Sequence, residues 1–300
     1  MTTARRTEPG PDLRPAIDTA LVRRLVDSQF PEWAGLPLKH LEPAGSDHVI
    51  HRLGDDLSVR LPRHGGAIGQ ARKEQYWLPR LAAQLPLAVP EPVAVGGPAY
   101  GYPWPWAVTR WLDGEVATVE GLGESGRAAR ELAAFLRALR RFDPGSDAAL
   151  PDASAEDLAA RDATTRSAIA AVAEVFDAPA MTALWNAALT GPGPQGPPVW
   201  FHGDFHTGNL LTVDGRLSAV IDFGNFGLGD PSVDLMIAFT LLSPGARAVF
   251  RAALDVDDAT WLRGRAWALT TGLTAYTAYA ATRPRVAAAT TRQIRAALTG

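Results

Sequence analysis

The amino-acid sequence predicts an α+β fold with two lobes: a small antiparallel β lobe containing one long helix, and a larger, mainly helical lobe. Short apolar runs of strand length are concentrated in the first third of the chain, where turn residues separate them. Beyond Asp113-Gly114, long runs with apolar residues at helical spacing predominate. We therefore assign residues 12–112 to an N-terminal lobe and residues 113–300 to a C-terminal lobe.

The N-terminal lobe follows a polar tail, residues 1–11, that we expect to be disordered. Helices are expected over residues 17–30 and 68–85, because apolar residues recur there at intervals of three and four. The expected strands are apolar runs bounded by turn residues: 36–41, 49–53, 57–61, 93–95 and 104–111.

The C-terminal lobe is expected to consist mostly of Ala- and Leu-rich helices. These cover residues 128–142, 155–176, 180–189, 233–242, 247–254, 259–281 and 286–298. A loop rich in Gly and Pro, residues 191–198, leads into a strand over residues 199–201. Two further strand-like runs, 209–213 and 217–221, are joined by Asp214-Gly215, a strong signal for a two-residue hairpin turn.

Composition and charge exclude several classes of protein. The chain has no cysteine, so disulfides, thiolate catalysis and cysteine metal sites are excluded. Without a signal-peptide core or an apolar run of membrane-spanning length, we expect a cytoplasmic protein with no membrane partner. The net charge of −3 disfavours a nucleic-acid partner. Residues 1–112 carry 13 basic and 11 acidic residues, and residues 113–300 carry 16 and 21, which favours an anionic nucleotide on the first lobe and a cationic acceptor on the second.

The most informative stretch contains the motif HGDFHTGN, residues 202–209, followed by IDFG, residues 221–224. Asp204 and Asn209 lie five residues apart at the start of the expected hairpin, and Asp222 follows its second strand. Phosphoryl transfer needs a carboxylate that orients the acceptor hydroxyl and oxygen ligands for magnesium, and these three residues would supply them.

A competing hypothesis is a transition-metal site that supports hydrolysis. His202, Asp204 and His206 alternate along the chain, so on a strand they would share one face and could ligate a metal. This hypothesis leaves Asn209 and Asp222 without a role.

The two motifs and the segment GDPSVDL, residues 229–235, resemble the aminoglycoside phosphotransferase family of small-molecule antibiotic kinases. The resemblance implies a protein-kinase-like bilobal fold and Mg²⁺-dependent transfer of phosphate from ATP or GTP to a hydroxyl. Many members inactivate aminoglycosides, and relatives act on macrolides, homoserine, choline or sugars. Asp204 matches the family's catalytic Asp, and Asn209 and Asp222 match its magnesium ligands.

Four further residues of this region are expected to hold the catalytic loop in shape. His202 would tie the loop to nearby backbone, and a loop-fixing role for His206 is favoured over proton transfer. Asp230-Pro231 has the composition of a helix start, with the carboxylate as the cap. Asp234 would face the loop and hold its backbone or His202.

The resemblance also predicts the nucleotide site. Arg60 stands where the family usually places a lysine that contacts the α- and β-phosphates, and Glu74 stands where its ion-pair partner belongs. Gly45 and Ser46 lie in the turn expected to cover the β- and γ-phosphates. The backbone of Arg110 and Leu112 would bind the purine edge. Because Arg60 and a glycine-poor turn are departures from the family, a nucleotide-binding pseudokinase remains an alternative.

The identity of the acceptor is left open by the sequence. An aminoglycoside-type antibiotic is the leading hypothesis, and a macrolide or a metabolic hydroxyl compound is the alternative. Candidate carboxylates for a polycationic acceptor are Asp152, Glu156, Asp157, Asp162, Glu174, Asp177, Asp255, Asp257 and Asp258. Candidate aromatic residues for an apolar acceptor are Trp185, Trp261, Trp267, Tyr276 and Tyr279.

Overall fold

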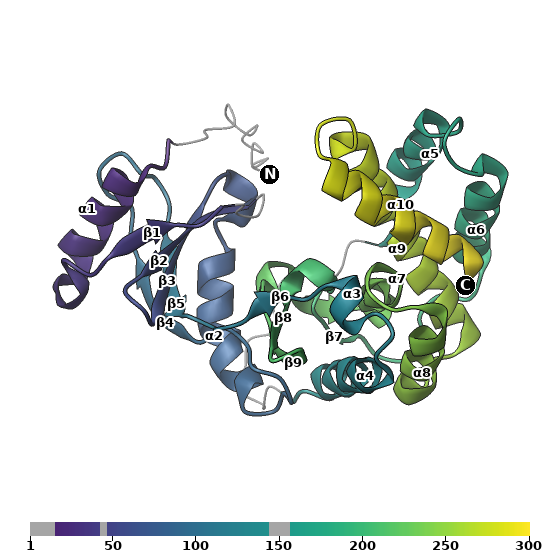
Figure 1. Cartoon of the computed structure of the whole chain (residues 1–300), viewed down its shortest axis with the longest axis horizontal. Coiled ribbons are helices and arrows are strands. Elements are labelled where there is room, and N and C mark those ends of the chain that lie inside the picture. Colours follow the sequence, from purple (N-terminus) through teal and green to yellow (C-terminus); the bar gives the residue numbers. More distant parts are fainter. Residues whose placement is uncertain (1–15, 43–46, 144–156) are drawn as a thin grey trace, which may run out of the picture. The chain divides into compact units, whose positions relative to one another are not determined.

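The computed structural model describes residues 16–42, 47–143 and 157–300. These residues form two compact units (Figure 1). The first comprises the described residues up to Ala82 together with Pro90–Leu112, and the second comprises Ala83–Val89 together with Asp113–Gly300. The predicted tail, residues 1–11, and the turn with Gly45 and Ser46 lie outside the described residues. The predicted α+β fold class is confirmed, because the first unit holds an antiparallel sheet and the second is mostly helical.

The sheet of the first unit has five antiparallel strands in the order β1-β2-β3-β5-β4. The strands are β1 (Leu38–His40), β2 (His48–Leu53), β3 (Leu57–Pro62), β4 (Pro92–Gly96) and β5 (Trp106–Arg110). The hairpin between β2 and β3 pairs Leu53 with Leu57, and Gly54 has a φ of 60° in its turn. β5 starts at Trp106 and not at the expected residue 104, because Pro105 has no N–H for a ladder hydrogen bond.

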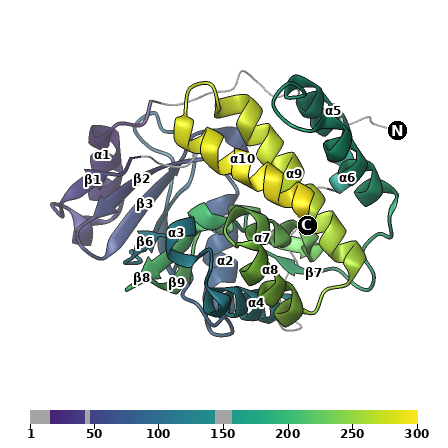
Figure 2. The same cartoon turned by 45° about the vertical axis from the view of Figure 1, so that its right-hand side comes forward.

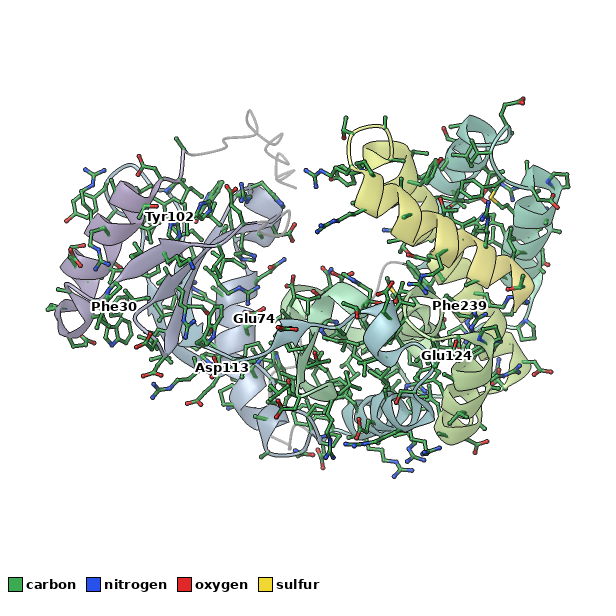
Figure 3. The ribbon with its side chains drawn as sticks, in the orientation of Figure 1. Phe30, Glu74, Tyr102, Asp113, Glu124 and Phe239 are labelled. Carbon is green, nitrogen blue, oxygen red and sulfur yellow. The ribbon has the colours of Figure 1, made fainter. Side chains whose placement is uncertain are left out.

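Two helices pack on this sheet from opposite sides (Figures 1 and 2). Helix α1 (Thr19–Gln29) buries Leu21, Val22 and Leu25 against the strands, and α2 (Gln70–Ala82) buries Trp77, Leu78 and Leu81. Short 3₁₀ turns, η1 (Pro31–Trp33) and η2 (Gly65–Ala67), follow α1 and precede α2. Phe30 and Tyr102, labelled in Figure 3, belong to the apolar core between α1 and the sheet.

The second unit contains most of the helices, and α9 and α10 lie side by side in both views (Figures 1 and 2). Its α-helices are α3 (Val119–Leu122), α4 (Gly126–Arg140), α5 (Asp162–Ala171), α6 (Ala178–Thr190), α7 (Ile237–Thr240), α8 (Pro244–Leu254), α9 (Asp258–Tyr279) and α10 (Pro284–Thr299). Its 3₁₀ turns are η3 (Leu158–Arg161), η4 (Thr207–Asn209), η5 (Phe223–Asn225) and η6 (Pro231–Met236).

Two small sheets complete the second unit. Strand β6 (Glu115–Val116) pairs with the hairpin of β8 (Leu210–Val213) and β9 (Arg216–Val220), and β7 (Val199–Phe201) pairs with β10 (Gly227–Gly229). Asp214 and Gly215 both have positive φ, 50° and 70°, as the predicted two-residue turn requires. The sequence analysis did not predict β6 or β10, because runs of two or three residues carry no periodicity.

Two predicted helices of the second unit are wrong in part. Within the described part of 155–176, the α-helix covers only Asp162–Ala171, because Val172 leaves helical geometry with a φ of −114° and a ψ of 13°. The helix expected over 233–242 is instead η6 followed by the single turn α7. We attribute its tight geometry to Asp234, whose side chain is committed to the backbone of another segment.

Candidate active site

A short strand and a glycine turn present Asp204 at the end of β7. The strand is anchored by Trp200, which stacks on Phe226 with ring centroids 4.8 Å apart and an interplanar angle of 6°. The chain then turns at Gly203, which has a φ of 84°. A Cβ atom at this position would lie 2.5 Å from the carbonyl oxygen of Asn225, so only glycine fits the turn.

Asp234 and His202 hold the backbone of this turn. The Asp234 carboxylate accepts hydrogen bonds from the N–H of His202 (2.8 Å) and of Gly203 (2.9 Å). The fully buried His202 ring accepts from the N–H of Asp204 at Nδ1 (3.2 Å), and its Nε2 lies 3.1 Å from the carbonyl oxygen of Ile221. Burial holds the pKa of His202 below its usual value, against the charges of the surrounding aspartates. The neutral tautomer with a proton on Nε2 therefore satisfies both contacts.

The carboxylate of Asp204 is kept ionised by its neighbours. Its Oδ2 lies 3.5 Å from Nε2 of His206 and accepts a hydrogen bond from Nδ2 of Asn209 (3.1 Å). Burial alone would raise the pKa of Asp204, but the hydrogen bond and charge of His206, with His202 and Asn209, hold it below the usual range. The same contact raises the pKa of His206 despite its burial. His206 also accepts a hydrogen bond from the N–H of Gly208 (3.0 Å), as a loop-fixing residue would.

Asn209 and Asp222 are brought together by the β8–β9 hairpin. Leu210 pairs with Val220, and the N–H of Ile221 donates to the carbonyl oxygen of Asn209 (2.9 Å), so Asp222 follows directly beside Asn209. The amide nitrogen of Asn209 donates to Asp204, which leaves the amide oxygen as the group that could ligate a cation. Asp222 adopts the left-handed conformation, with a φ of 67°. A carboxylate and an amide oxygen fit magnesium, which takes oxygen ligands and completes its shell with phosphates and water.

The hypothesis of a transition-metal site on His202, Asp204 and His206 is wrong. Within the described residues, no group of three or more His, Cys, Asp or Glu side chains could hold a metal ion. Both ring nitrogens of His202 are already engaged, with the N–H of Asp204 and with the carbonyl of Ile221. The alternation of the three residues does not place them on one strand face, because β7 ends at Phe201.

Asp230 caps η6 as predicted, and two arginines that the sequence analysis did not single out surround it. The carboxylate of Asp230 accepts from the N–H of Ser232 (3.0 Å) and forms an ion pair with Arg263 of α9 (2.7 Å). Arg140 of α4 lies 3.4 Å from the carbonyl oxygen of Pro231. No short motif links these arginines to the loop, since their separation in sequence is large and their role depends on tertiary packing.

In the first unit, Arg60 and Glu74 form the ion pair that their positions predict. Nη1 of Arg60 lies 2.9 Å from Oε2 of Glu74, and both residues are buried (Glu74 is labelled in Figure 3). His48, on the neighbouring strand, is also buried, and burial together with the charge of Arg60 lowers its pKa to about 3. The role of Arg60 and Glu74 toward a nucleotide stays a prediction.

The expected purine-binding segment ends β5 in the first unit. The N–H of Arg110 donates to the carbonyl oxygen of Glu91 (2.8 Å), and the N–H of Trp111 donates to that of Asp56 (2.7 Å). The N–H of Arg110 is therefore already engaged. The predicted contact of Arg110 with the purine edge would have to use its carbonyl oxygen. Leu112 is the last residue of this unit.

Most of the candidate acceptor residues have structural partners. Asp157, Asp177 and Asp257 cap η3, α6 and α9. Asp162 accepts from Nε1 of Trp185 and pairs with Arg166, and Asp258 pairs with Arg251. Trp185, Trp261 and Trp267 are buried in the core, whereas Tyr279 is 40% exposed. Asp152 and Glu156 lie outside the described residues.

Comparison with known proteins decides the family. A family model described as the phosphotransferase enzyme family, APH, matches residues 39–268, which is more than half of the chain. The chain belongs to the APH phosphotransferase family. No curated protein sequence matches this APH family member.

Solved structures agree with the family assignment. The APH chain is similar to a complex of APH(2″)-IIIa with GDP and kanamycin, with 18% identity, a TM-score of 0.74, and coverage of 94% of this chain and 100% of that one. It is also similar to a streptomycin–ATP complex of APH(2″)-IIa, with 18% identity, a TM-score of 0.61, and coverage of 95% of this chain and 99% of that one. A third similar structure is the macrolide 2′-phosphotransferase MphH from Brachybacterium faecium, with 25% identity, a TM-score of 0.61, and coverage of 90% of this chain and 96% of that one. Within the described residues, no helix is long and apolar enough to span a membrane.

Proposed function

We propose that this APH phosphotransferase moves the γ-phosphate of ATP or GTP to a hydroxyl of a small molecule, with Asp204 as the catalytic carboxylate. The observation that carries the proposal is the constellation of Asp204, Asn209 and Asp222 within one hairpin and its preceding turn. A polar hairpin without this function would need neither the amide of Asn209 aimed at Asp204 nor Asp222 in the left-handed conformation.

In this mechanism Asp204 accepts a hydrogen bond from the acceptor hydroxyl and aims its lone pair at phosphorus. The transition state of phosphoryl transfer is loose, so positioning matters more than strong basicity, and an ionised Asp204 with a lowered pKa suffices. Asn209 and Asp222 would hold Mg²⁺, which neutralises charge on the phosphates. His206 holds the Asp204 carboxylate in place.

The nucleotide part of the proposal assigns Arg60 to the phosphates. A guanidinium can bridge a carboxylate and a phosphate through separate N–H groups, so its ion pair with Glu74 is compatible with the role. The nucleotide complexes of structural neighbours support a nucleoside triphosphate donor. Such a donor also fits the cytoplasmic location expected from the sequence.

Two acceptor classes belong to the proposal. An aminoglycoside-type antibiotic is the first, and the neighbours with kanamycin and streptomycin support it. The second is a macrolide, and two observations favour it. The macrolide 2′-phosphotransferase is 25% identical, against 18% for those two aminoglycoside neighbours. Moreover, five carboxylates that could have met a polycation act as helix caps or ion-pair partners.

The test is a phosphate-transfer screen with ATP and GTP over aminoglycosides, macrolides and simple hydroxyl metabolites. We expect acceptor-dependent ADP or GDP release and a phosphorylated product that mass spectrometry identifies. Nucleotide binding without transfer to any acceptor would instead support the pseudokinase alternative.

A further inference from the structure

Arg263 in α9 is a buried cation that contacts two segments next to the loop of residues 202–209: the start of η6 and the loop before β7. It is 5% exposed, and its Nε and Nη2 face the two carboxylate oxygens of Asp230 at 2.7 and 3.4 Å. Its Nη1 donates to the carbonyl oxygen of Pro192 (2.8 Å), in the loop that leads into β7. One side chain therefore joins α9 to both segments that flank the pair of β7 and β10.

The backbone next to Arg263 makes an equally close contact. A Cβ atom at Gly264 would lie 2.5 Å from Cβ of Leu235, so α9 and η6 touch where only glycine fits. Asp230 lies at the start of η6 and Leu235 near its end. α9 thus contacts η6 at two residues, Asp230 and Leu235, and Asp234 lies between them in the chain.

A continuous series of contacts then leads to the catalytic carboxylate. Asp234 accepts from the N–H groups of His202 and Gly203, and Nδ1 of His202 accepts from the N–H of Asp204. Since Asp234 is 1% exposed, its carboxylate has little freedom apart from that of η6 itself.

We propose that Arg263 is a positioning residue for phosphoryl transfer: by clamping Asp230 it sets η6, and through Asp234 it sets the backbone that carries Asp204. The catalytic part of this inference rests on the proposed function. Loss of the clamp should lower kcat, because misplacement of a catalytic group by about 1 Å can cost about 10²-fold in rate. Nucleotide affinity in the absence of Mg²⁺ should change little, because Arg60, the cation expected at the phosphates, lies in the first unit.

The experiment compares four variants with the parent chain. Arg263→Met removes the clamp and leaves the half-buried carboxylate of Asp230 without its ion-pair partner, whereas Arg263→Met/Asp230→Asn removes that charge as well. Arg263→Lys retains the positive charge but cannot form the bidentate contact with Asp230. Arg247→Met is the matched control, because Arg247 is equally buried, at 4% exposed, but binds the carbonyls of Ala296 and Gly300 at the end of α10.

Four quantities are measured for each variant: Tm, nucleotide Kd without Mg²⁺, kcat, and hydrogen exchange of the amides of His202 and Gly203. We expect Arg263→Met to lose about 10²-fold in kcat, to keep its nucleotide Kd and to lose protection of both amides. The double variant should regain Tm but not kcat or protection, Arg263→Lys should be intermediate, and Arg247→Met should keep the parent's kcat.

Recovery of kcat and protection together with Tm in the double variant would show that Arg263 only stabilises the fold, and would overturn the proposal. So would parental protection of the two amides in the double variant, or a loss of kcat in Arg247→Met as large as in Arg263→Met. If the parent chain transfers phosphate to no acceptor, the proposed function fails. The exchange measurement then still decides whether Arg263 holds the loop.

Discussion

At the scale of single residues, the carboxylate that we propose as catalytic, Asp204, is defined by its neighbours. Asp204 is held by His206 and Asn209, and both contacts favour the ionised carboxylate. The sequence predicted the identity of these residues from their spacing. It could not predict that His206 would pair with Asp204, because that contact depends on the backbone path of the loop.

Asp204→Asn should retain nucleotide binding and lose about two to four decades of turnover, the range for a positioned acid–base group. The amide keeps the shape of the side chain but cannot accept the hydroxyl proton. Steady-state kinetics on the identified acceptor, with nucleotide Kd as the control, test this expectation. Unchanged turnover would remove Asp204 from the mechanism.

Asp222→Ala should abolish Mg²⁺-dependent nucleotide binding or transfer, because no neutral side chain replaces a carboxylate that would hold Mg²⁺. Titration of the variant with nucleotide in the presence and absence of Mg²⁺ is the measurement. If both variant and parent show the same Mg²⁺ dependence, the assignment of IDFG as the metal-binding segment is wrong.

Arg60→Ala should raise the nucleotide KM by roughly one to two decades, since a charge-assisted hydrogen bond contributes about 1.5–3 kcal/mol. It should also destabilise the first unit by about 3–5 kcal/mol, because Glu74 is then buried without the charge of the Arg60 guanidinium. Arg60→Lys should retain measurable activity.

A double-mutant cycle with Glu74→Gln provides the control for Arg60. The two substitutions break the same ion pair, so their effects on stability should be less than additive. Strict additivity, or a normal nucleotide KM in Arg60→Ala, would show that Arg60 does not serve the phosphates.

At the scale of elements, long periodic helices and the β8–β9 hairpin were predictable, and short irregular elements were not. The Asp214-Gly215 turn and the helices α8, α9 and α10 lie where local patterns put them. By contrast, the sequence predicts a regular helix at η6, because its apolar residues have helical spacing, whereas its geometry depends on contacts with β7 and α9. Local sequence does not contain those contacts.

The close approach of α9 to η6 gives a prediction at this scale. Gly264→Ala should destabilise the second unit by about 1–3 kcal/mol, because the added methyl group would meet Leu235 at 2.5 Å. Urea unfolding measures the change. The matched control is Gly245→Ala in α8, where a Cβ atom meets nothing within 4 Å, and which should be neutral or stabilising by up to about 1 kcal/mol. Equal stability of the two variants would contradict the packing argument.

At the scale of the whole molecule, the pair of Asp204 and His206 links stability to pH. The pKa of Asp204 is lowered in the folded chain. Its contribution to the free energy of unfolding is therefore present above the pKa of the unfolded chain, about 3.9, and is lost as pH falls through the folded-state pKa. The pKa of His206 is raised in the folded chain. Its contribution to the free energy of unfolding is therefore complete below the pKa of the unfolded chain, about 6.5, and is lost as pH rises through the folded-state pKa. Both contributions are therefore complete between about pH 4 and 6.5.

His206→Gln should accordingly destabilise the chain more at pH 5.5 than at pH 9 in urea unfolding. His51→Gln gives the opposite trend, because burial lowers the pKa of His51 to about 4 and the parent loses stability when the unfolded ring protonates below about 6.5. A pH-independent effect of His206→Gln would show that the imidazole carries no charge in the pair.

The β8–β9 hairpin has a consequence for how chains of this kind can change in length. Its turn, Asp214-Gly215, has open space around Gly215 and lies beyond the ladder that aligns Asn209 with Asp222. Insertions there should leave the alignment intact, so this turn is a natural place to graft a peptide or to accept residues during divergence. Between Asp222 and Asp234 the opposite holds. A single inserted residue would move one carboxylate relative to the other, and recombination across that segment should yield inactive chimaeras.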